Sequence, residues 1–248
     1  MIEKQRTVSC PAHVPDLCVI EILRPKDYAC FCDDGYGLVS HLQMLGYDPQ
    51  YIRAYTFQTF KDALRKFKQS RYRFLHISCH GGTDSVEFWD AKDMEPDNHS
   101  YQGTQIPYDA FSKALKGCLG DRRVTFSACE LGNKQFVQSL IKYNNGFHSV
   151  VAPTVELQMH KAAVLWRMYY GQLLADASCS LSAKSVKSDS VVYAVQNCSR
   201  AMETPLACCI SKPHNTHGHW PCNFYSEVLG NKVLTRKSFH MGSKPIGR

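Results

Sequence analysis

Short apolar runs alternate along this chain with longer segments whose apolar residues recur every three or four positions. The short runs are rich in β-branched and aromatic residues, so they predict buried strands. The longer segments predict helices with one apolar face, as in 59–69, where Phe60, Leu64 and Phe67 form one stripe. The expected strands are 17–23, 51–57, 72–79, 123–129 and 147–153, and the expected helices are 37–47, 59–69, 107–117, 133–143 and 159–177.

This alternation of strands and helices is typical of a layered α/β fold. The segment 85–90 is predicted to be a short hairpin arm, and the polar stretch 91–106 a loop. The serine-rich segment 178–190 fits a loop or the start of a helix, and 190–198 fits a strand or a helix. The last expected strand lies near 219–228.

The chain shows no internal repeat and no linker, so we expect one domain over 17–230. An N-terminal extension, 1–16, is expected before it and a polar tail, 231–248, after it. A chain of 248 residues is long enough to bury a core without help from disulfides or metals.

Composition narrows the class of protein only mildly. Hydrophobic residues make up 44% and charged residues 21% of the chain, as in ordinary globular proteins. The net charge of +7 permits an acidic partner without requiring one, and direct binding of nucleic acid is not expected. No apolar run approaches the ~18 residues that a membrane span needs, and the N-terminus lacks an apolar signal core. We therefore expect a cytoplasmic protein whose twelve cysteines are reduced thiols.

Two strand ends carry residues suited to catalysis. The stretch FLHISCHGG ends a predicted strand in His80 and two glycines, and TFSACELG places Cys129 at the end of another. Because ligands gather at the carboxyl ends of strands in open α/β sheets, we expect these side chains to lie close together. A thiol becomes a ready nucleophile when an imidazole can take its proton, and backbone N–H groups at the turns could hold an oxyanion.

The order HISCHGG and then FSACELG resembles the motifs of caspase-like (clan CD) cysteine peptidases, and it is most similar to the CHAT domain family. The stretches LWRMYYGQLL and HWPCNFYSEV are similar to a helix and a closing strand of that family. The resemblance implies a three-layer fold, with a central, mostly parallel sheet flanked by helices on both faces. It also implies that His80 is the general base, that Cys129 is the nucleophile, and that Gly81 supplies an oxyanion N–H together with Cys129.

The resemblance is incomplete at the position that would select the substrate. Metacaspases have an aspartate two residues before the nucleophile, whereas this chain has Ser127. The remaining acidic candidates for substrate binding also fit solvated carboxylates; they are Asp33, Asp34, Glu130 and Glu156.

Three further features each allow two interpretations. His76 shares a strand face with Ser78 and His80, so it either supports the catalytic histidine or is a core histidine. A cysteine- and histidine-rich segment could hold zinc, although no pair has C-x-x-C spacing and no metal is expected; its candidates are Cys208, Cys209, His214, His217, His219 and Cys222. A basic cluster fits a solvated helix face or a patch for nucleic acid or an acidic protein; it contains Lys61, Arg65, Lys66, Lys68, Arg71 and Arg73.

The sequence therefore predicts a cysteine endopeptidase that needs no cofactor and cleaves protein substrates. The resemblance suggests a regulated effector in cell death or anti-invader defence, switched on by a partner protein. The alternative is a catalytically silent scaffold of the same fold that binds partner proteins.

Overall fold

The computed structural model describes residues 17–29, 33–89, 103–144, 146–176, 188–211, 222–225 and 237–239. Within them, an eight-stranded sheet has the strand order β10-β9-β8-β7-β6-β3-β1-β2. The five strands from β2 to β7 run parallel, and β8, β9 and β10 are antiparallel to their neighbours. The strands are β1 (Leu17–Ile22), β2 (Gln50–Arg53), β3 (Phe74–Cys79), β6 (Arg123–Ser127), β7 (Ser149–Pro153), β8 (Leu206–Ser211), β9 (Cys222–Tyr225) and β10 (Lys237–Phe239).

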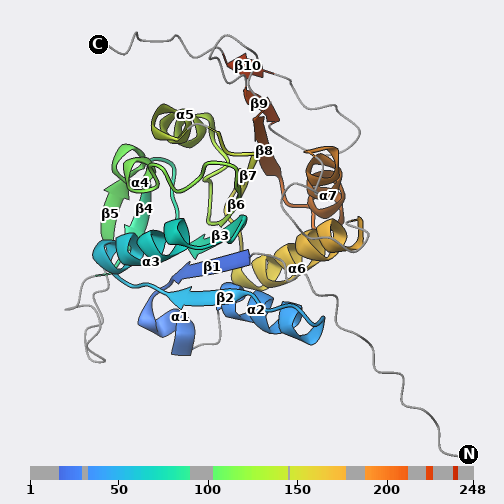
Figure 1. Cartoon of the computed structure of the whole chain (residues 1–248), viewed down its shortest axis with the longest axis horizontal. Coiled ribbons are helices and arrows are strands. Elements are labelled where there is room, and N and C mark those ends of the chain that lie inside the picture. The colour runs from blue at the N-terminus through green and yellow to red at the C-terminus, as the bar shows by residue number, and fades with distance from the viewer. Residues whose placement is uncertain are drawn as a thin grey trace, which may run out of the picture.

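Helices cover both faces of this sheet (Figure 1). On one face lie α3 (Phe57–Gln69), α4 (Tyr108–Ala114) and α5 (Lys134–Tyr143), and on the other lie α2 (Asp34–Met44), α6 (Met159–Asp176) and α7 (Ser188–Ala201). The predicted fold class, a three-layer α/β fold with a mostly parallel central sheet, is confirmed.

The period-two pattern of β1 explains why the sheet is buried on both faces. Cys18, Ile20 and Ile22 pack toward α3, α4 and α5, whereas Leu17 and Val19 pack toward α2, α6 and α7. Such strands read as continuous apolar runs, as expected for a parallel sheet covered by helices.

Two small elements stand outside this sandwich. The hairpin of β4 (Ser85–Phe88) and β5 (Thr104–Pro107) follows the end of β3 and forms a separate two-stranded sheet. The short helix α1 (Pro25–Ala29) follows β1. Both therefore begin at the carboxyl edge of the parallel strands, where the candidate site lies.

Several sequence predictions need correction. The stretch 104–106 was expected in a loop but belongs to β5, because it pairs with β4. The strands expected over 51–57 and 123–129 end at Arg53 and Ser127, and the helix expected over 37–47 begins at Asp34. The ambiguous 190–198 lies in the helix α7.

Three elements were missed or misplaced near the chain's ends. Neither α1 nor β8 was expected, and β8 pairs antiparallel with β7. The closing strand near 219–228 corresponds to β9, but it is not the last strand, since β10 lies in the predicted polar tail and pairs with β9. The extension 1–16 and most of the serine-rich segment 178–190 lie outside the described residues. None of the helices within the described ranges is long and apolar enough to cross a membrane.

Candidate active site

The register of two neighbouring strands sets the positions of the predicted histidine and cysteine. In the parallel pair β3 and β6, Ser78 lies opposite Ser127. His80 and Cys129 each follow two residues later, so the chain delivers both to the same edge of the sheet. The prediction that strand ends bring these two residues together therefore has a direct basis in the register.

Both side chains line one pocket of about 230 Å³ at this edge. Ser127, Glu156 and Leu157 contribute to the same pocket, and Arg24 contributes from the segment between β1 and α1. The pocket thus combines an imidazole, a thiol and charged groups of both signs in one concave site, a combination typical of active sites.

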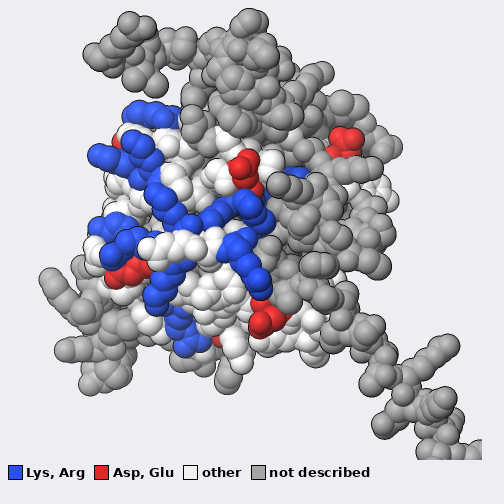
Figure 2. Space-filling model, in the orientation of Figure 1, with Lys and Arg blue, Asp and Glu red and all other residues white. Residues whose placement is uncertain are grey.

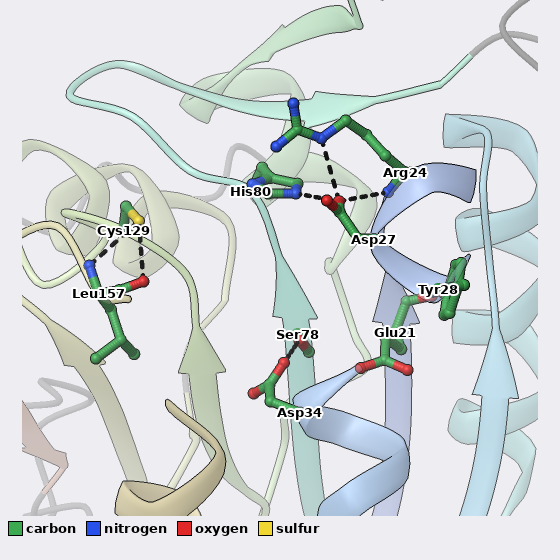
Figure 3. Close-up of polar contacts among 9 residues, drawn as sticks. All are labelled: Glu21, Arg24, Asp27, Tyr28, Asp34, Ser78, His80, Cys129 and Leu157. Carbon is green, nitrogen blue, oxygen red and sulfur yellow. Dashed lines mark hydrogen bonds and ion pairs between the residues drawn. The ribbon is translucent and has the colours of Figure 1, made fainter. Parts of the chain in front are cut away.

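The imidazole of His80 is held by a carboxylate that the sequence did not reveal. His80 Nε2 lies 2.7 Å from Asp27 Oδ2, and both side chains are mostly buried (Figure 3). The same carboxylate oxygen accepts hydrogen bonds from Arg24 Nε at 3.1 Å and from the Arg24 backbone N–H at 3.0 Å. Burial works to raise the pKa of Asp27, but the hydrogen bond and charge of His80 and the charge of Arg24 together lower it below its usual value.

With Nε2 donating to Asp27, the second ring nitrogen, Nδ1, carries the lone pair that can accept a proton. Trp89 packs edge-on against the His80 ring, with the ring centroids 6.3 Å apart, and the Arg24 guanidinium lies 5.7 Å from the Trp89 ring. Asp27, Arg24 and Trp89 therefore fix the orientation of the imidazole.

The thiol of Cys129 makes its contacts on the other side of the pocket. Its Sγ lies 3.3 Å from the backbone N–H of Leu157 and 3.8 Å from the Leu157 carbonyl oxygen. Figure 3 shows the sulfur directed toward Leu157 and the His80 ring directed toward Asp27. Burial raises the pKa of Cys129, and the charges of Glu156 and Glu130 raise it further, although the Leu157 N–H acts against them. This arrangement favours the neutral thiol over the thiolate.

The turn that follows His80 packs closely against the turn that carries Cys129. Gly81 forms a bridge with Val86 through the bonds Glu87 N–H to His80 O and Gly82 N–H to Ser85 O, and neither bond uses the N–H of Gly81. A Cβ at Gly81 would lie 2.6 Å from the Cys129 carbonyl oxygen and 2.2 Å from Leu131 Cδ1. Glycine is therefore required here, because the two turns approach each other at the backbone.

The turn that presents Cys129 is itself unusual. Glu130 has φ of 59°, a left-handed conformation that a glutamate rarely adopts, and its N–H donates to the Val155 carbonyl. Strained backbone of this kind is common where a functional side chain must be held at a sharp turn.

The four acidic candidates for substrate binding are placed differently. Glu156 lines the pocket. Asp34 is buried and does not line the pocket. It accepts hydrogen bonds from Ser78 and, at 2.6 Å, from the hydroxyl of Ser127, a residue that lines the pocket. Asp33 lies 4.0 Å from Arg53 at the start of α2, and neither it nor Glu130 lines the pocket.

A second buried carboxyl group lies beneath Asp34. Glu21, at the end of β1, is fully buried and accepts hydrogen bonds from the Gly35 N–H at 2.7 Å and from the Tyr51 hydroxyl. Burial, reinforced by the charge of Asp34, raises the pKa of Glu21 to about 8. Two buried acidic groups therefore lie near the carboxyl ends of the central strands, and of these Asp34 contacts the pocket-lining Ser127.

His76 and the remaining cysteines have structural surroundings. His76 is fully buried between Trp166 and Tyr170, with its Nε2 4.0 Å from Asp34. Cys79 is buried in the core on the α3 side of the sheet. Within the described residues no group of three metal-ligating side chains forms; Cys208 and Cys209 are buried in β8, and the histidines of the cysteine- and histidine-rich segment lie outside those residues.

Sequence comparisons add little to this picture. No family model matches the chain, and no curated protein matches it. Among solved structures, 30 chains match. One is an X-ray structure of a secreted C11 cysteine protease from Bacteroides thetaiotaomicron in complex with an irreversible peptide inhibitor, at 10% sequence identity and a TM-score of 0.46. The match covers 81% of this chain and 66% of that one, so the chain spans slightly less than two thirds of the other protein's length. The chemistry of the site must be deduced from its own residues.

Proposed function

We propose that this chain is a cysteine endopeptidase in which Cys129 is the nucleophile and His80 the general base. The observation that carries the proposal is that β3 and β6 deliver both side chains to one pocket, beside the Gly81 turn. The resemblance of the HISCHGG and FSACELG motifs to those of caspase-like peptidases supports the same assignment. The place of the chain in the CHAT branch, its cytoplasmic location and its role in cell death or defence stay predictions.

The chemistry requires the thiol to leave Leu157 when a peptide carbonyl enters the pocket. His80 Nδ1 takes the thiol proton, and Sγ attacks the carbonyl carbon to form a tetrahedral intermediate. The N–H groups of Gly81 and Cys129 hold its oxyanion. His80 then protonates the leaving amine, the C–N bond breaks and a thioester remains. Water attacks the thioester as His80 takes its proton, which releases the acid product and restores the thiol.

One observation favours the silent scaffold as the second candidate. Among the hydrogen bonds of the described residues, none joins Cys129 to His80, and the pKa of Cys129 is raised rather than lowered. A protein that binds partners through the same pocket would need no activated thiol.

The two functions are separated by replacing Cys129 and His80 one at a time. Cys129→Ala and His80→Ala should each abolish cleavage of a peptide library, since one removes the nucleophile and the other the base. An electrophilic peptide probe should label Cys129 in the wild-type chain and fail to label it in His80→Ala. Cys79→Ala is the matched control, because Cys79 also lines the pocket but is fully buried and its pKa is raised far above the usual thiol range.

Circular dichroism and thermal unfolding establish that each variant is folded. Cleavage that persists in folded Cys129→Ala rules out the proposed nucleophile. A folded wild-type chain that cleaves no member of the library, with or without cell lysate as a source of activator, favours the scaffold.

A further inference from the structure

The positive charge of this protein is concentrated in two segments. Residues 57–73 contain six lysines and arginines and one acidic residue, and residues 113–123 contain four and one. The chain has 29 basic and 22 acidic residues. Outside these two segments, 19 basic and 20 acidic residues remain, so that part of the chain is slightly acidic. Figure 2 shows basic side chains gathered over the region of α3 and α4. The first segment contains α3, and the second contains the end of α4 and the loop that leads to β6.

A groove of about 310 Å³ lies between these two elements. Lys61, Arg65 and Lys68 occupy successive turns of one face of α3, and Lys116 faces them from just after α4. The residues that line the groove include these four cations and no carboxylate. Asp62, which lies outside the lining, forms an ion pair with Arg65. Among the described residues, no ion pair is formed by Lys61, Lys68 or Lys116.

Gly117 lies between the lining residues Lys116 and Cys118, where the chain turns after α4. Gly117 has φ of 73°, and a Cβ there would lie 3.1 Å from Lys68 Nζ. The Lys68 ammonium therefore reaches across from α3 and lies against the backbone of the opposite wall. Cys118, directly after the turn, is buried and forms part of the groove lining.

We propose that this groove binds a compact oligophosphate, a small anion with several neighbouring phosphate groups. Basic side chains on successive turns of a helix place their positive charges close together, so that they can bind neighbouring phosphate groups. The groove's volume suits a small molecule. The uncharged lining consists of Gln58, Leu64, Ala114 and Cys118. It offers no aromatic ring on which a base could stack, which disfavours single-stranded nucleic acid as the ligand.

This site is separate from the pocket of His80 and Cys129. The groove lies in the helical layer of α3 and α4, whereas the pocket lies at the carboxyl edge of β3 and β6, and the two share no lining residue. The proposal therefore stands whether or not the chain is a peptidase.

The test measures binding of inorganic tripolyphosphate to the full chain by isothermal titration calorimetry at low salt. The groove pair Lys68→Gln with Lys116→Gln should weaken binding roughly tenfold or more, because it removes two facing charges. The control pair Lys66→Gln with Lys113→Gln removes the same charge from the same two elements, but neither residue lines the groove. It should weaken binding less than threefold, through long-range charge alone.

Three results would overturn the proposal. The first is failure of the wild-type chain to bind tripolyphosphate more tightly than sulfate at equal ionic strength. The second is equal weakening by the groove and control pairs, which would assign binding to net charge. The third is binding of a single-stranded oligonucleotide that strengthens with its length and is not displaced by tripolyphosphate. If the groove pair fails to fold, Lys116→Gln alone, at an exposed position beyond the helix, is measured against Lys113→Gln.

Discussion

At the scale of single residues, the hydrogen bond between His80 and Asp27 decides which imidazole nitrogen can accept a proton. A carboxylate acceptor on Nε2 keeps the proton there, orients the ring and stabilises the imidazolium that forms during catalysis. Arg24 holds Asp27 in turn through two hydrogen bonds. Arg24, from the segment between β1 and α1, and Asp27, from the five-residue α1, thus hold the His80 ring, and neither belongs to the strand that precedes His80.

Replacing Asp27 with asparagine should impair catalysis without removing binding. The amide keeps the shape but loses the negative charge, so we expect kcat to fall roughly 10- to 100-fold while KM changes little. The measurement is steady-state kinetics with a fluorogenic peptide found in the library. Arg24→Gln keeps the carboxylate and serves as the control, with a smaller loss expected. A variant Asp27→Asn with full kcat would mean that His80 needs no carboxylate partner.

The same substitution has a signature in stability. Because the pKa of Asp27 is lowered in the folded chain, its ionised form stabilises the fold above the ordinary aspartate range, and this contribution disappears as pH falls through the folded-state pKa. Asp27→Asn should therefore be less stable than wild type at neutral pH, and urea unfolding should show the difference shrinking as pH falls below the ordinary aspartate range.

Glu156 in the pocket lining and Asp34 behind Ser127 are acidic, so we expect a basic residue before the cleaved bond to be favoured. Glu156 lines the pocket, and Asp34 lies behind the Ser127 hydroxyl, from which it accepts a hydrogen bond. We expect peptides with arginine at that position to be cleaved at least tenfold faster than those with aspartate. Glu156→Gln should reduce this ratio, and Glu87→Gln, outside the pocket lining, should not. A preference for aspartate would contradict the expectation and assign selection to Arg24.

His80 and Cys129 could be found from the sequence because each follows an apolar strand, and strand ends are visible in a hydrophobic pattern. Asp27 could not, because α1 has five residues, too few to show a helical period. The available signal was local: Pro25 at the first helical position and Asp27 two residues later, a pattern typical of a helix start. Nothing in it indicates that the carboxylate points at a histidine 53 residues away.

At the scale of elements, the helices and strands that could be predicted are those long enough to show a clear hydrophobic pattern. The helices α3 and α5 carry clear apolar stripes, and the strands β1, β3, β6 and β7 are buried on both faces, so all were predictable. The short β5 is mostly exposed, and its existence depends on pairing with β4. In β8, two adjacent cysteines suggested metal ligands, whereas both are buried within the sheet.

The contact between the β3–β4 turn and the β6–α5 turn is the element-level feature on which the site depends. Gly81→Ala would place a Cβ against the Cys129 carbonyl and Leu131, so the turns must separate and the proposed oxyanion N–H moves. We expect at least a hundredfold loss of kcat/KM and a loss of stability on the order of 1–3 kcal/mol.

Gly82→Ala provides the control for that substitution. A Cβ at Gly82 meets no atom within 4 Å, so activity and stability should stay close to wild type. Both variants are compared by kcat/KM and by urea unfolding. If Gly81→Ala is as active as Gly82→Ala, the oxyanion cannot depend on the close approach of these two turns.

At the scale of the whole molecule, the three layers separate three tasks. The sheet edge carries the candidate chemistry, one helical layer carries the basic groove, and the buried Glu21 lies where β1, β2 and α2 meet. The sequence showed the charge cluster and the strand ends, but only the folded chain shows that they lie in different layers. It also shows that the predicted polar tail contributes β10 to the sheet, which a polar composition does not reveal.

The buried Glu21 should make the stability of the entire fold depend on pH. Its folded-state pKa of about 8 lies above the unfolded value of 4.5, so the folded chain retains a proton that the unfolded chain releases between these values. Unfolding therefore becomes easier as pH rises from about 5 to 8, by an amount on the order of 2 kcal/mol. Glu21→Gln imitates the protonated side chain and cannot release that proton, so this decline should flatten. Urea unfolding at pH 5, 6.5 and 8 measures it, with Glu87→Gln, at a half-buried position in β4, as the control. Parallel pH curves for Glu21→Gln and wild type would show that Glu21 is already ionised in the folded protein and that Gly35 and Tyr51 fully stabilise its charge.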